Sequence, residues 1–553
     1  MSERERPDMV GWYDPAQLLR TGLQTVLTEV FSTRADFRLI MAIGEPQEPR
    51  SFADRDAFWI DYMADTGDGW RPTTTVLHAL AQPSLHVDDE ALPRGDLLIM
   101  GGDQVYPAGG VAAYESRLLA PMRAVSPERA PSTAPLLLAI PGNHDWYDGL
   151  TGFVNTFAQR DFLGMWQTFQ RRSYHCLQLP HRHWLVAVDI QLQCDIDVAQ
   201  RRWFEAALAG LAEGDHVVLC IAEPTWVFRQ QYAKDHGPQT RALVRFITKE
   251  KKARVVLWLA GDLHHYRRME RVDERATRGA QYVTAGGGGA FLHPTHTPSI
   301  ERLQRGRRRE TRRYQVSREY PSRAVSRAMA ARNLLFPLLN LRFGFATAAL
   351  YTLLSWLLPQ PDLQAIDAGV GPTIRRGLAQ AAEQPSAIAL VAGLLVAVVY
   401  FTDSNRRAYR IGAGLVHGLT HLLGALGATA AGLWFAHVLG VQHDVVARRL
   451  VMIAASAVLG YALGGIIMGA YLFVSVRVFR RHGNEAFSSL REEGWKNFLR
   501  LRVDAKGLTL WAFGIERMPT RWTSAPWPLP SDPAPEAAPK VIDTVHIPGP
   551  VAR

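Results

Sequence analysis

Cysteine is scarce in this chain: its 553 residues include three, Cys176, Cys194 and Cys220. They show neither CxxC spacing nor pairing along the sequence, so we predict no disulfide framework and a reducing compartment. The first eight residues, Met-Ser-Glu-Arg-Glu-Arg-Pro-Asp, lack the apolar core of a secretion signal. We therefore expect no cleaved signal peptide.

Charge and apolar residues are unevenly distributed along the chain. Hydrophobic residues make up 47% of it, which is ordinary, but after residue 333 they gather into long blocks. The net charge is +10, and residues 301–332 carry +8 of it with eleven Arg against three Glu. Because a chain of this length exceeds one hydrophobic core, we expect several domains.

The Arg-rich segment 301–333 directly precedes an apolar block. Basic stretches next to a membrane attract anionic lipid headgroups and set topology, so we interpret this segment as a juxtamembrane linker. Arginine runs also neutralise nucleic-acid phosphates, but the adjoining apolar block favours the membrane, and we expect no nucleic-acid partner. A solvated, partly helical connector is the simpler alternative.

Four later blocks approach or exceed the roughly 20 apolar residues that span a bilayer. They are Leu334–Leu358, Ser386–Thr402, Gly412–Val441 and Leu450–Val478. We therefore predict an all-α, four-helix transmembrane domain over residues 334–479. The Arg-rich linker, together with Arg residues in the loop 403–411 and after residue 476, predicts cytoplasmic termini and a cytoplasmic catalytic domain, in the cell or inner membrane.

His417 and His421 lie four residues apart in the third block, hence on one helix face. Ionisable residues inside membranes often bind metals or relay protons. Hydrogen bonding between helices is the alternative, and we favour it because no carboxylate lies within the same span.

The chain after the apolar blocks divides into two parts. Residues 480–524 contain an alternating stretch, Phe498–Arg517, broken by a turn at Asp504–Gly507, which predicts a β-hairpin. An isolated hairpin is marginally stable, so we expect it to pack on the N-terminal domain. Residues 525–553 are rich in proline, and we predict that they are disordered.

Four short apolar runs in the first half have the character of buried parallel strands. They are Leu97–Met100, Leu136–Ile140, Val217–Ile221 and Val255–Leu259. Each precedes a polar block: Gly102-Asp103-Gln104-Val105-Tyr106, Gly142-Asn143-His144-Asp145, Ala222-Glu223-Pro224 and Gly261-Asp262-Leu263-His264-His265. Because ligands bind beyond the carboxyl ends of strands in α/β sheets, we expect these blocks to meet at one edge of one sheet. Carboxylates, imidazoles, an amide and a phenol are metal-binding groups.

Together with Asp65-Thr66-Gly67, these blocks resemble the calcineurin-like metallophosphoesterase superfamily. Its pattern runs D-x-H or D-x-G, G-D-x-x-H/Y, G-N-H-D/E, a His before a small-Pro turn, and G-H-x-H. The G-N-H-D block at 142–145 matches in full, and Tyr106 matches the purple-acid-phosphatase form of the second block. The resemblance covers residues 55–296, and segments 145–149 and 286–296 are similar to a membrane-bound branch.

The resemblance implies an α/β/β/α sandwich for the catalytic domain, placed at residues 1–300. It also implies hydrolysis of a phosphate mono- or diester by metal-activated water at two metal ions. Asp103 is implied as the bridge between them, and Asp65, Tyr106 and His264 as ligands of the first, with Tyr106 a phenolate on a ferric ion. Since D-x-G is a weak pattern, Asp61 and Asp68 are alternatives to Asp65.

The same resemblance implies Asn143 as a ligand of the second metal. His144 is implied as the acid, or as the imidazolium that stabilises the leaving oxygen. Asp145 would orient His144 by a hydrogen bond and so fix its tautomer.

Two positions depart from the family pattern, and both fall on the second metal. The expected His before the Pro turn is absent and Glu223 stands beside the turn, while Asp262 replaces the first His of G-H-x-H. Carboxylates favour harder ions such as Mn, Mg or Ca over Zn at this second position. For the two ions together, the candidates are Fe, Mn, Mg or Zn as divalent or mixed-valence ions. If Glu223 points away, the domain is instead a non-catalytic phosphate or ligand sensor that regulates a membrane transport or signalling bundle. We favour the enzyme, because the attacking and acid residues are present.

A four-glycine loop at 286–289 precedes His293 and His296. Glycine lets a backbone approach a phosphate closely, so His296 is a candidate substrate-binding residue, with His293 a weaker one. Membrane tethering favours a phosphorylated small molecule or lipid as substrate. The sequence specifies neither the substrate nor the oligomeric state.

Overall fold

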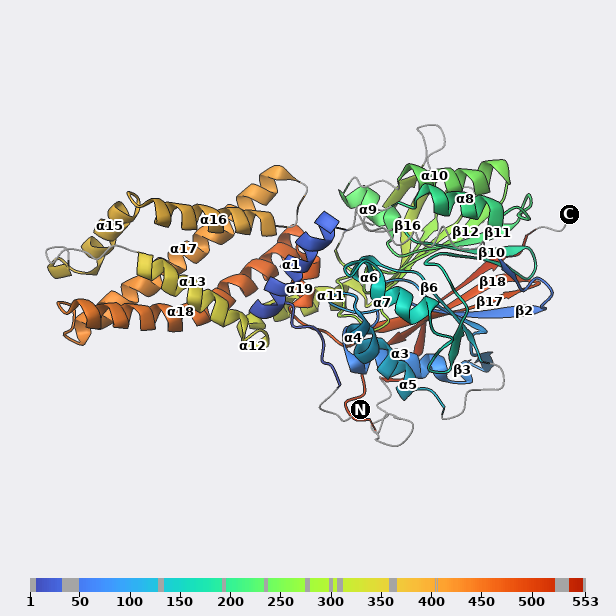
Figure 1. The fold of residues 1–553 in the computed structure, drawn as a ribbon, viewed down its shortest axis with the longest axis horizontal. Coiled ribbons are helices and arrows are strands. Elements are labelled where there is room, and N and C mark those ends of the chain that lie inside the picture. Colours follow the sequence, from blue (N-terminus) through green and yellow to red (C-terminus); the bar gives the residue numbers. More distant parts are fainter. Residues whose placement is uncertain are drawn as a thin grey trace. The chain divides into compact units, whose positions relative to one another are not determined.

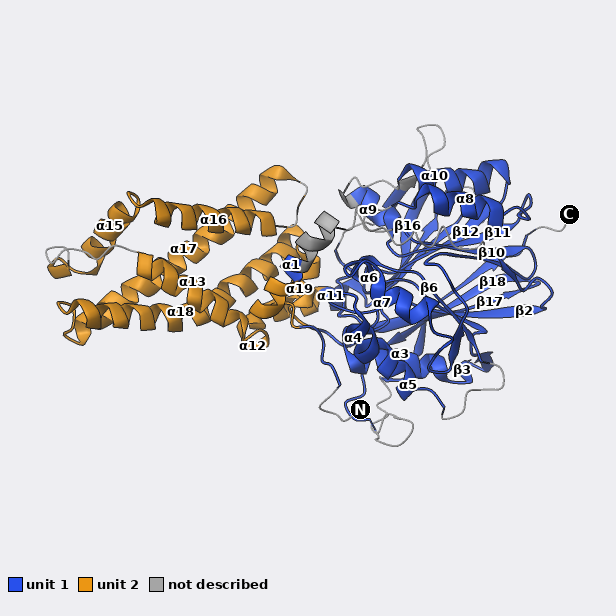
Figure 2. Ribbon diagram, in the orientation of Figure 1, with its two compact units in different colours: residues 1–10, 21–326, 491–553 blue, residues 11–20, 327–490 orange. Residues whose placement is uncertain are grey.

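The computed structural model describes residues 6–31, 49–127, 134–190, 195–232, 237–273, 279–297, 302–305, 312–357, 366–402, 404, 406–522 and 537–550. The chain divides into two compact units (Figure 2). Unit 1 comprises Met1–Val10, Thr21–Ser326 and Arg491–Arg553, and unit 2 comprises Gly11–Arg20 and Arg327–Leu490. Unit 1 is an α/β domain, whereas unit 2 is helical (Figure 1).

The first large sheet of unit 1 has nine strands in the order β1-β9-β10-β11-β12-β14-β13-β16-β15. Its centre is parallel, from β10 through β11 and β12 to β14. The strands are β1 (Arg50–Ser51), β9 (His175–Leu179), β10 (His183–Val188), β11 (His216–Ile221), β12 (Arg254–Ala260), β13 (Tyr266–Arg271), β14 (Gln281–Ala285), β15 (Arg302–Arg305) and β16 (Arg312–Tyr320).

The second large sheet has eight strands in the order β19-β18-β17-β2-β5-β6-β8-β7. Its parallel centre runs from β2 through β5 and β6 to β8. The strands are β2 (Ala57–Met63), β5 (Leu97–Met100), β6 (Leu136–Ala139), β7 (Phe162–Leu163), β8 (Trp166–Thr168), β17 (Lys496–Asp504), β18 (Gly507–Ile515) and β19 (Lys540–Pro548), beside a small hairpin of β3 (Ser84–Val87) and β4 (Glu90–Pro93).

Three buried apolar clusters make unit 1 a four-layer domain. One lies between the sheets and takes residues such as Ile60 of β2 and Leu185 of β10. The others lie between each sheet and its outer helices, as Leu77 and Phe204 illustrate (Figure 1). The helices are α3 (Trp70–Ala81), α4 (Val111–Tyr114), α5 (Ala120–Ala124), α6 (Asn143–Trp146), α7 (Thr151–Phe153), α8 (Val198–Ala207), α9 (Thr225–Tyr232) and α10 (Pro238–Arg245). The expected α/β/β/α layering is therefore present.

All four apolar runs form strands as predicted, but they do not share one sheet. β5 and β6 belong to the eight-stranded sheet, whereas β11 and β12 belong to the nine-stranded sheet. The prediction of one sheet is wrong because an apolar run records that a strand is buried on both faces, not which strand it pairs with.

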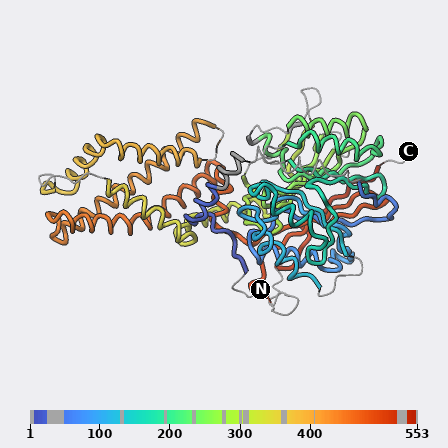
Figure 3. Tube along the Cα trace, viewed as in Figure 1, coloured from blue at the N-terminus to red at the C-terminus, as the bar shows by residue number. Residues whose placement is uncertain are grey.

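The C-terminal segment completes the eight-stranded sheet. β17 and β18 pair with each other, and β17 pairs antiparallel with β2, nearly 440 residues earlier (Figure 3). The structure differs from the prediction of disorder at 525–553, because β19 forms there and pairs with β18. Its alternating Val541, Val545 and Ile547 are obscured in composition by the surrounding prolines, and the partner strand lies far away in sequence.

The Arg-rich segment also differs from the expected linker. β15 and β16 lie within it, and β16 pairs with β13, so this part of 301–333 extends the nine-stranded sheet. Arginine side chains on an edge strand remain solvated while the backbone pairs, so charge alone did not exclude a strand here.

Unit 2 is built from long apolar helices. In the part of the chain that the structure describes, Arg407–Val438 and Val445–Phe479 are long and apolar enough to cross a membrane. Two bent pairs, Arg323–Leu339 with Phe343–Leu357 at 63° and Val370–Ala381 with Pro385–Phe401 at 92°, would raise the number to four if each is one span. The helices are α11 (Arg323–Ala330), α12 (Phe336–Leu339), α13 (Phe343–Leu357), α15 (Val370–Ala381), α16 (Pro385–Phe401), α17 (Arg407–Val438), α18 (Val445–Val474) and α19 (Gly483–Ser488), while α1 (Pro15–Phe31) begins in this unit.

Within unit 2, α18 packs on α13 and α17, and α16 packs on α17. Gly460 and Gly464 of α18 face Tyr351 and Thr347 of α13, at distances where a Cβ atom would clash. The residue numbers run in opposite directions along this contact, so α13 and α18 are antiparallel. Small residues let the two backbones approach closely, as in many membrane bundles.

Candidate functional site

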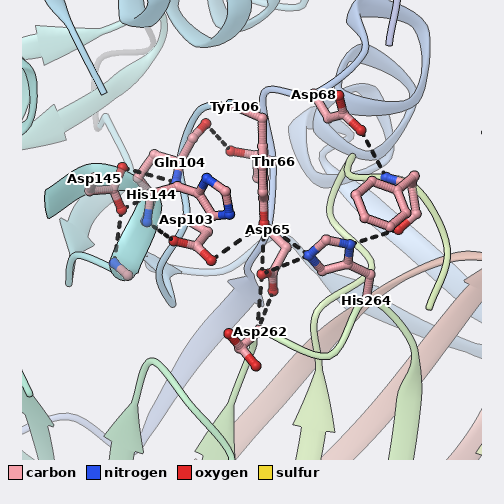
Figure 4. Close-up of polar contacts among 12 residues, drawn as sticks. Asp65, Thr66, Asp68, Asp103, Gln104, Tyr106, His144, Asp145, Asp262 and His264 are labelled. Atoms are coloured by element: carbon pink, nitrogen blue, oxygen red, sulfur yellow. Dashed lines mark hydrogen bonds and ion pairs between the residues drawn. The ribbon is translucent and has the colours of Figure 1, made fainter. Parts of the chain in front are cut away.

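The candidate ligands lie in turns that follow strands of both sheets (Figure 4). Asp65 follows β2, Asp103 follows β5, and Asp262 and His264 follow β12. Asp65, Asp103 and Asp262 all adopt the left-handed backbone region, with φ of 59°, 50° and 66°. Such residues are uncommon and cluster at functional sites. The backbone N–H of Asp262 donates to Asp65 Oδ2 at 2.9 Å, which joins the two sheets at this point.

The Tyr106 hydroxyl lies at the centre of the predicted first-metal ligands (Figure 4). Its oxygen is 3.1 Å from Asp65 Oδ1, 3.4 Å from Asp103 Oδ2 and 2.9 Å from His264 Nε2. Residues 65, 103, 106 and 264 are thus brought together across 199 positions of sequence. Each is nearly or fully buried.

Two glycines allow the backbone to approach these carboxylates. A Cβ atom on Gly142 would lie 2.2 Å from Asp103 Oδ1, and one on Gly286 would lie 2.5 Å from Asp65 Oδ2. Any side chain at either position would displace the carboxylate. This close approach explains glycine in the G-N-H-D block and at the start of the four-glycine loop.

His264 is held in one tautomer by the segment after that loop. Its Nδ1–H donates to the Phe291 carbonyl oxygen at 2.7 Å, so Nε2 presents its lone pair towards Tyr106 and Asp65. Burial lowers the pKa of His264 to about 3, which keeps the imidazole neutral. A neutral imidazole whose other nitrogen donates to a carbonyl is the arrangement typical of a metal ligand.

His144 and Asp145 differ from the predicted partnership. His144 Nδ1–H donates to the Pro107 carbonyl oxygen at 2.7 Å, and the His144 backbone N–H donates to Asp103 Oδ1 at 2.8 Å. Asp145 instead accepts from the backbone N–H groups of Gly142 and Gln104 and from the Tyr114 hydroxyl. The expectation that Asp145 fixes the His144 tautomer is therefore corrected. A backbone carbonyl does this, and it leaves no signature in sequence.

The predicted second-metal residues lie in the neighbourhood of Tyr147. Asn143 Nδ2 donates to the Tyr147 hydroxyl at 3.1 Å, which leaves the amide oxygen of Asn143 as its acceptor end. Negative charge on Asp103, Asp262 and Glu223 contributes to the raised pKa of Tyr147, after burial as the main cause. Glu223 and Asp262, both half-buried, thus lie within electrostatic reach of the same phenol.

The alternatives to Asp65 have other partners. Asp61 forms a buried ion pair with Arg500 of β17, at 2.7 Å and 2.9 Å. Asp68 accepts from the backbone N–H groups of Val10 and Phe291. Asp61 and Asp68 therefore brace the fold, and the first-metal group contains Asp65.

His296 is buried, and its Nδ1 lies 2.7 Å from Ser326 Oγ. His293 stacks on His264 with ring centroids 3.8 Å apart, and it is half-buried. Of the two, His293 is the imidazole in contact with a site residue. The sequence-based preference for His296 overlooked this, because spacing after a glycine loop does not show which ring stacks on which.

Two residues near the site carried no sequence signal. Lys496 and Asn497 begin β17 and are fully buried. The Asn497 backbone N–H donates to Gly287 of the four-glycine loop, and burial lowers the pKa of Lys496 to about 8. They come from beyond the motif blocks, so only the three-dimensional pairing of β17 reveals them.

The side chains at the strand ends are of types that bind metal cations. Within the described ranges, no three His, Cys, Asp or Glu side chains already surround a common metal position. Burial, however, raises the pKa of Asp65, and burial together with the charges of Asp65, Asp145 and Asp262 raises that of Asp103. Among described residues neither carboxylate pairs with Lys or Arg, so the ionised pair needs an added cation. Two carboxylates, a neutral imidazole and a phenol supply ligands for it.

Fold and strand-end residues together define a phosphoesterase-type α/β domain. Residues 58–266 match the sequence model of the family described as calcineurin-like phosphoesterase. This confirms the resemblance found in the motifs.

A comparison with curated proteins finds no match. Distant solved structures include GAP50, the anchor in the inner membrane complex of Plasmodium, at 11% identity and a TM-score of 0.32, covering 43% of this chain and 74% of that one. Purple acid phosphatase PPD1 from yellow lupin (Lupinus luteus) seeds matches at 16% identity and a TM-score of 0.30, covering 44% of this chain and 46% of that one. PhoD matches at 14% identity and a TM-score of 0.30, covering 46% of this chain and 62% of that one. The chain therefore spans about half the length of the lupin enzyme.

Proposed function

We propose that unit 1 is a metal-dependent phosphoesterase that hydrolyses a phosphate mono- or diester, and that unit 2 anchors it in a membrane. The observation that carries the proposal is the meeting of Asp65, Asp103 and His264 at the Tyr106 hydroxyl. The family domain supports it, because members of this family generally bind divalent metals.

Two bound metals would lower the pKa of a coordinated water and neutralise charge on the transferring phosphoryl group. Asp103 is suited to bridge them because its two oxygens face different neighbours. Oδ2 faces Tyr106 at 3.4 Å, whereas Oδ1 faces the G-N-H-D loop and accepts the His144 N–H at 2.8 Å. Asp65, Tyr106 and His264 would hold one ion from the Oδ2 side.

Asn143, Glu223 and Asp262 would hold the second ion. Asn143 would use its amide oxygen, since its Nδ2 donates to Tyr147. With two carboxylates in place of two imidazoles, this position suits Mn²⁺ or Mg²⁺.

His144 would act on the leaving group. With Nδ1 held on the Pro107 carbonyl, Nε2 is the ring atom that exchanges a proton with the leaving oxygen. Asp145 would hold the loop rather than the ring, because its carboxylate ties Gly142 to Gln104.

Membrane anchoring rests on the helices of unit 2. Long apolar helices with many exposed large hydrophobic side chains, such as Leu423, Val458 and Ile466, are costly in water and stable in lipid. Anchoring favours a phosphorylated lipid or a membrane-proximal small molecule as substrate.

Hydrolysis of an aryl phosphodiester and an aryl phosphomonoester by the purified full chain, loaded with Mn²⁺, tests the proposal. Asp103→Asn should abolish turnover and lower bound metal measured by mass spectrometry. Asp96→Asn is the matched control, because Asp96 precedes the same strand, β5, at its opposite end and pairs with Arg55. If the protein binds phosphate but shows no hydrolysis with Mn²⁺, Mg²⁺, Fe²⁺ or Zn²⁺, the domain is a non-catalytic phosphate sensor and the enzymatic proposal is wrong.

A further inference from the structure

A second group of buried titratable side chains lies wholly within unit 2. Imidazole, phenol and carboxyl groups from α13, α17, α18 and the start of α19 meet there, although the helices are otherwise apolar. In order through the bundle they are Glu485, His482, Tyr471, His417, His421 and Tyr351.

The first half of this group contains one hydrogen bond and one longer ion-pair contact. Glu485 Oε2 lies 3.5 Å from His482 Nδ1, and His482 Nε2 lies 2.9 Å from the Tyr471 hydroxyl. Glu485 is the solvent-facing end, because its side chain is 25% exposed whereas His482 is fully buried. The other half ends in a contact of 3.1 Å between His421 Nδ1 and the Tyr351 hydroxyl.

His417 joins the two halves. Its ring stacks on Tyr471 with centroids 3.9 Å apart, and it lies 5.0 Å from the His421 ring. The side chain is 3% exposed, yet neither ring nitrogen has a hydrogen-bond partner among the described residues. Burying an imidazole in this way costs free energy unless a polar partner is present at least part of the time. Phe401 of α16 closes this side of the ring with an apolar face.

Two further hydroxyl groups continue the line beyond Tyr351. Along the antiparallel contact, Thr347 faces Gly464 and Tyr351 faces Gly460, so the next turn sets Ser355 opposite Ser456. Both serine hydroxyls are buried and lack a partner in the described part of the chain. Arg448, also buried, lies two turns farther along the same face of α18, and Asp444 caps that helix.

We propose that unit 2 conducts protons along this column of imidazole, phenol and hydroxyl groups. Hydrogen bonding between helices accounts for the Tyr351–His421 and Tyr471–His482 contacts, but it does not account for His417, Ser355 and Ser456 without partners. A relay does, because each of its members exchanges partners as the proton moves. A metal site is less suited, since His417 and His421 are the two imidazoles on one face and no third His, Cys, Asp or Glu joins them within the described ranges.

The transfer balances without any other reactant. A proton reaching the Glu485 carboxylate passes to His482 Nδ1, and the Nε2 proton of the same ring passes to the Tyr471 oxygen as the phenol releases its own. His417, which stacks on Tyr471 and has no hydrogen-bond partner among the described residues, must turn towards the Tyr471 oxygen to accept that proton at one nitrogen. It then releases a proton from its other nitrogen, and His421 and Tyr351 repeat the exchange. Each group ends with the protons it began with, and one proton has moved along the bundle.

The full-length protein, reconstituted in vesicles of phosphatidylcholine and phosphatidylglycerol, tests this proposal. A potassium gradient with valinomycin drives protons, and a trapped pH-sensitive dye reports their entry. We expect flux above that of protein-free vesicles, and a loss of about 100-fold in His417→Phe, the lower end of the range for removal of a positioned proton-transfer group. The phenyl ring keeps the stack on Tyr471 but cannot carry a proton.

His437→Gln is the matched control, because His437 lies on the same helix but is exposed. Tyr471→Phe is the second variant: it keeps the ring stack and removes the hydroxyl that contacts His482 and Thr402. Monodisperse elution in detergent checks that each variant is folded. Flux equal to that of empty vesicles, or equal flux in wild type, His417→Phe and Tyr471→Phe, would overturn the proposal. Zinc binding that depends on His417 without proton flux would assign the group to a metal instead.

Discussion

The two clusters of titratable side chains described above, one in each unit, obey opposite electrostatic rules. In unit 1, Asp65 and Asp103 are buried side by side with Asp145 and Asp262 near them, and burial raises the pKa of both. In unit 2, the buried members are imidazoles, phenols and hydroxyls that are stable when neutral. Carboxylates gathered in this way need cations to remain ionised, whereas neutral groups need only hydrogen-bond partners.

The two clusters also differ in backbone conformation: one lies in turns and the other on helices. Asp65, Asp103 and Asp262 sit in left-handed turns after strands, where backbone N–H groups reach the carboxylates. His417 and His421 occupy successive turns of a regular helix, whose backbone groups are already paired. Turns can thus hold charge with N–H groups, but a helix interior offers side chains alone.

Asp103→Asn removes a charge from the carboxylate cluster of unit 1 and should give the largest effect. The change keeps the shape but removes the charge that would join two metals. We expect hydrolysis to fall on the order of 10³-fold, as for loss of a principal electrostatic group in an active site. Steady-state kinetics of the Mn²⁺-loaded protein measures it. Proton flux through unit 2 should be unchanged in this variant, and a joint loss would contradict the separation of the two clusters.

Inserting a charge into the neutral cluster should give the next largest effect. His417→Glu places a carboxylate in a regular helix, where the backbone N–H groups are already paired. We expect unfolding to become easier by about 3–5 kcal/mol, as for an unpaired buried charge. Denaturant titration of the detergent-solubilised protein measures this, with the exposed His437→Glu as control. Equal stability of the two variants would mean that His417 has access to a counter-charge.

Metal removal should separate the clusters without any substitution. A ligand present at 100 to 1,000 times its dissociation constant stabilises a folded protein by about 3–4 kcal/mol, so chelation should lower the melting temperature of unit 1. Differential scanning calorimetry measures the shift. The same chelator should leave the Asp103→Asn protein and the proton flux unaffected. A chelator effect that persists in Asp103→Asn would place the bound metal elsewhere.

The sequence predicted the charged cluster far better than its surroundings. The G-N-H-D block and the apolar runs located Asp103, Asn143 and His264 because these residues follow buried strands, which local sequence records. Local sequence does not record which sheet each strand joins, so the four apolar runs were assigned to one sheet instead of two. Partners made by backbone atoms were also beyond reach, as the Pro107 carbonyl on His144 shows.

Long-range pairing was the second limit. β17 meets β2 after more than 430 intervening residues, and β19 forms inside a segment whose prolines predict disorder. The register of α13 on α18, which sets Ser355 opposite Ser456, likewise depends on glycines that sequence marks only as favourable for close packing.

Tyr114→Phe should give the smallest effect, and it distinguishes two roles for Asp145. The Tyr114 hydroxyl donates to Asp145 Oδ1, and the Asp145 carboxylate still accepts from the backbone N–H groups of Gly142 and Gln104 in the variant. We expect a loss of about 1.5–3 kcal/mol in the free energy of unfolding, as for one hydrogen bond to a charged group. If Asp145 only holds the loop, the pH dependence of kcat/KM should stay unchanged, because His144 is oriented by Pro107. Tyr147→Phe provides the contrast, since it removes the partner of Asn143 and should weaken Mn²⁺ affinity with little change in stability. A shifted pH profile in Tyr114→Phe would instead return Asp145 to the role of orienting His144.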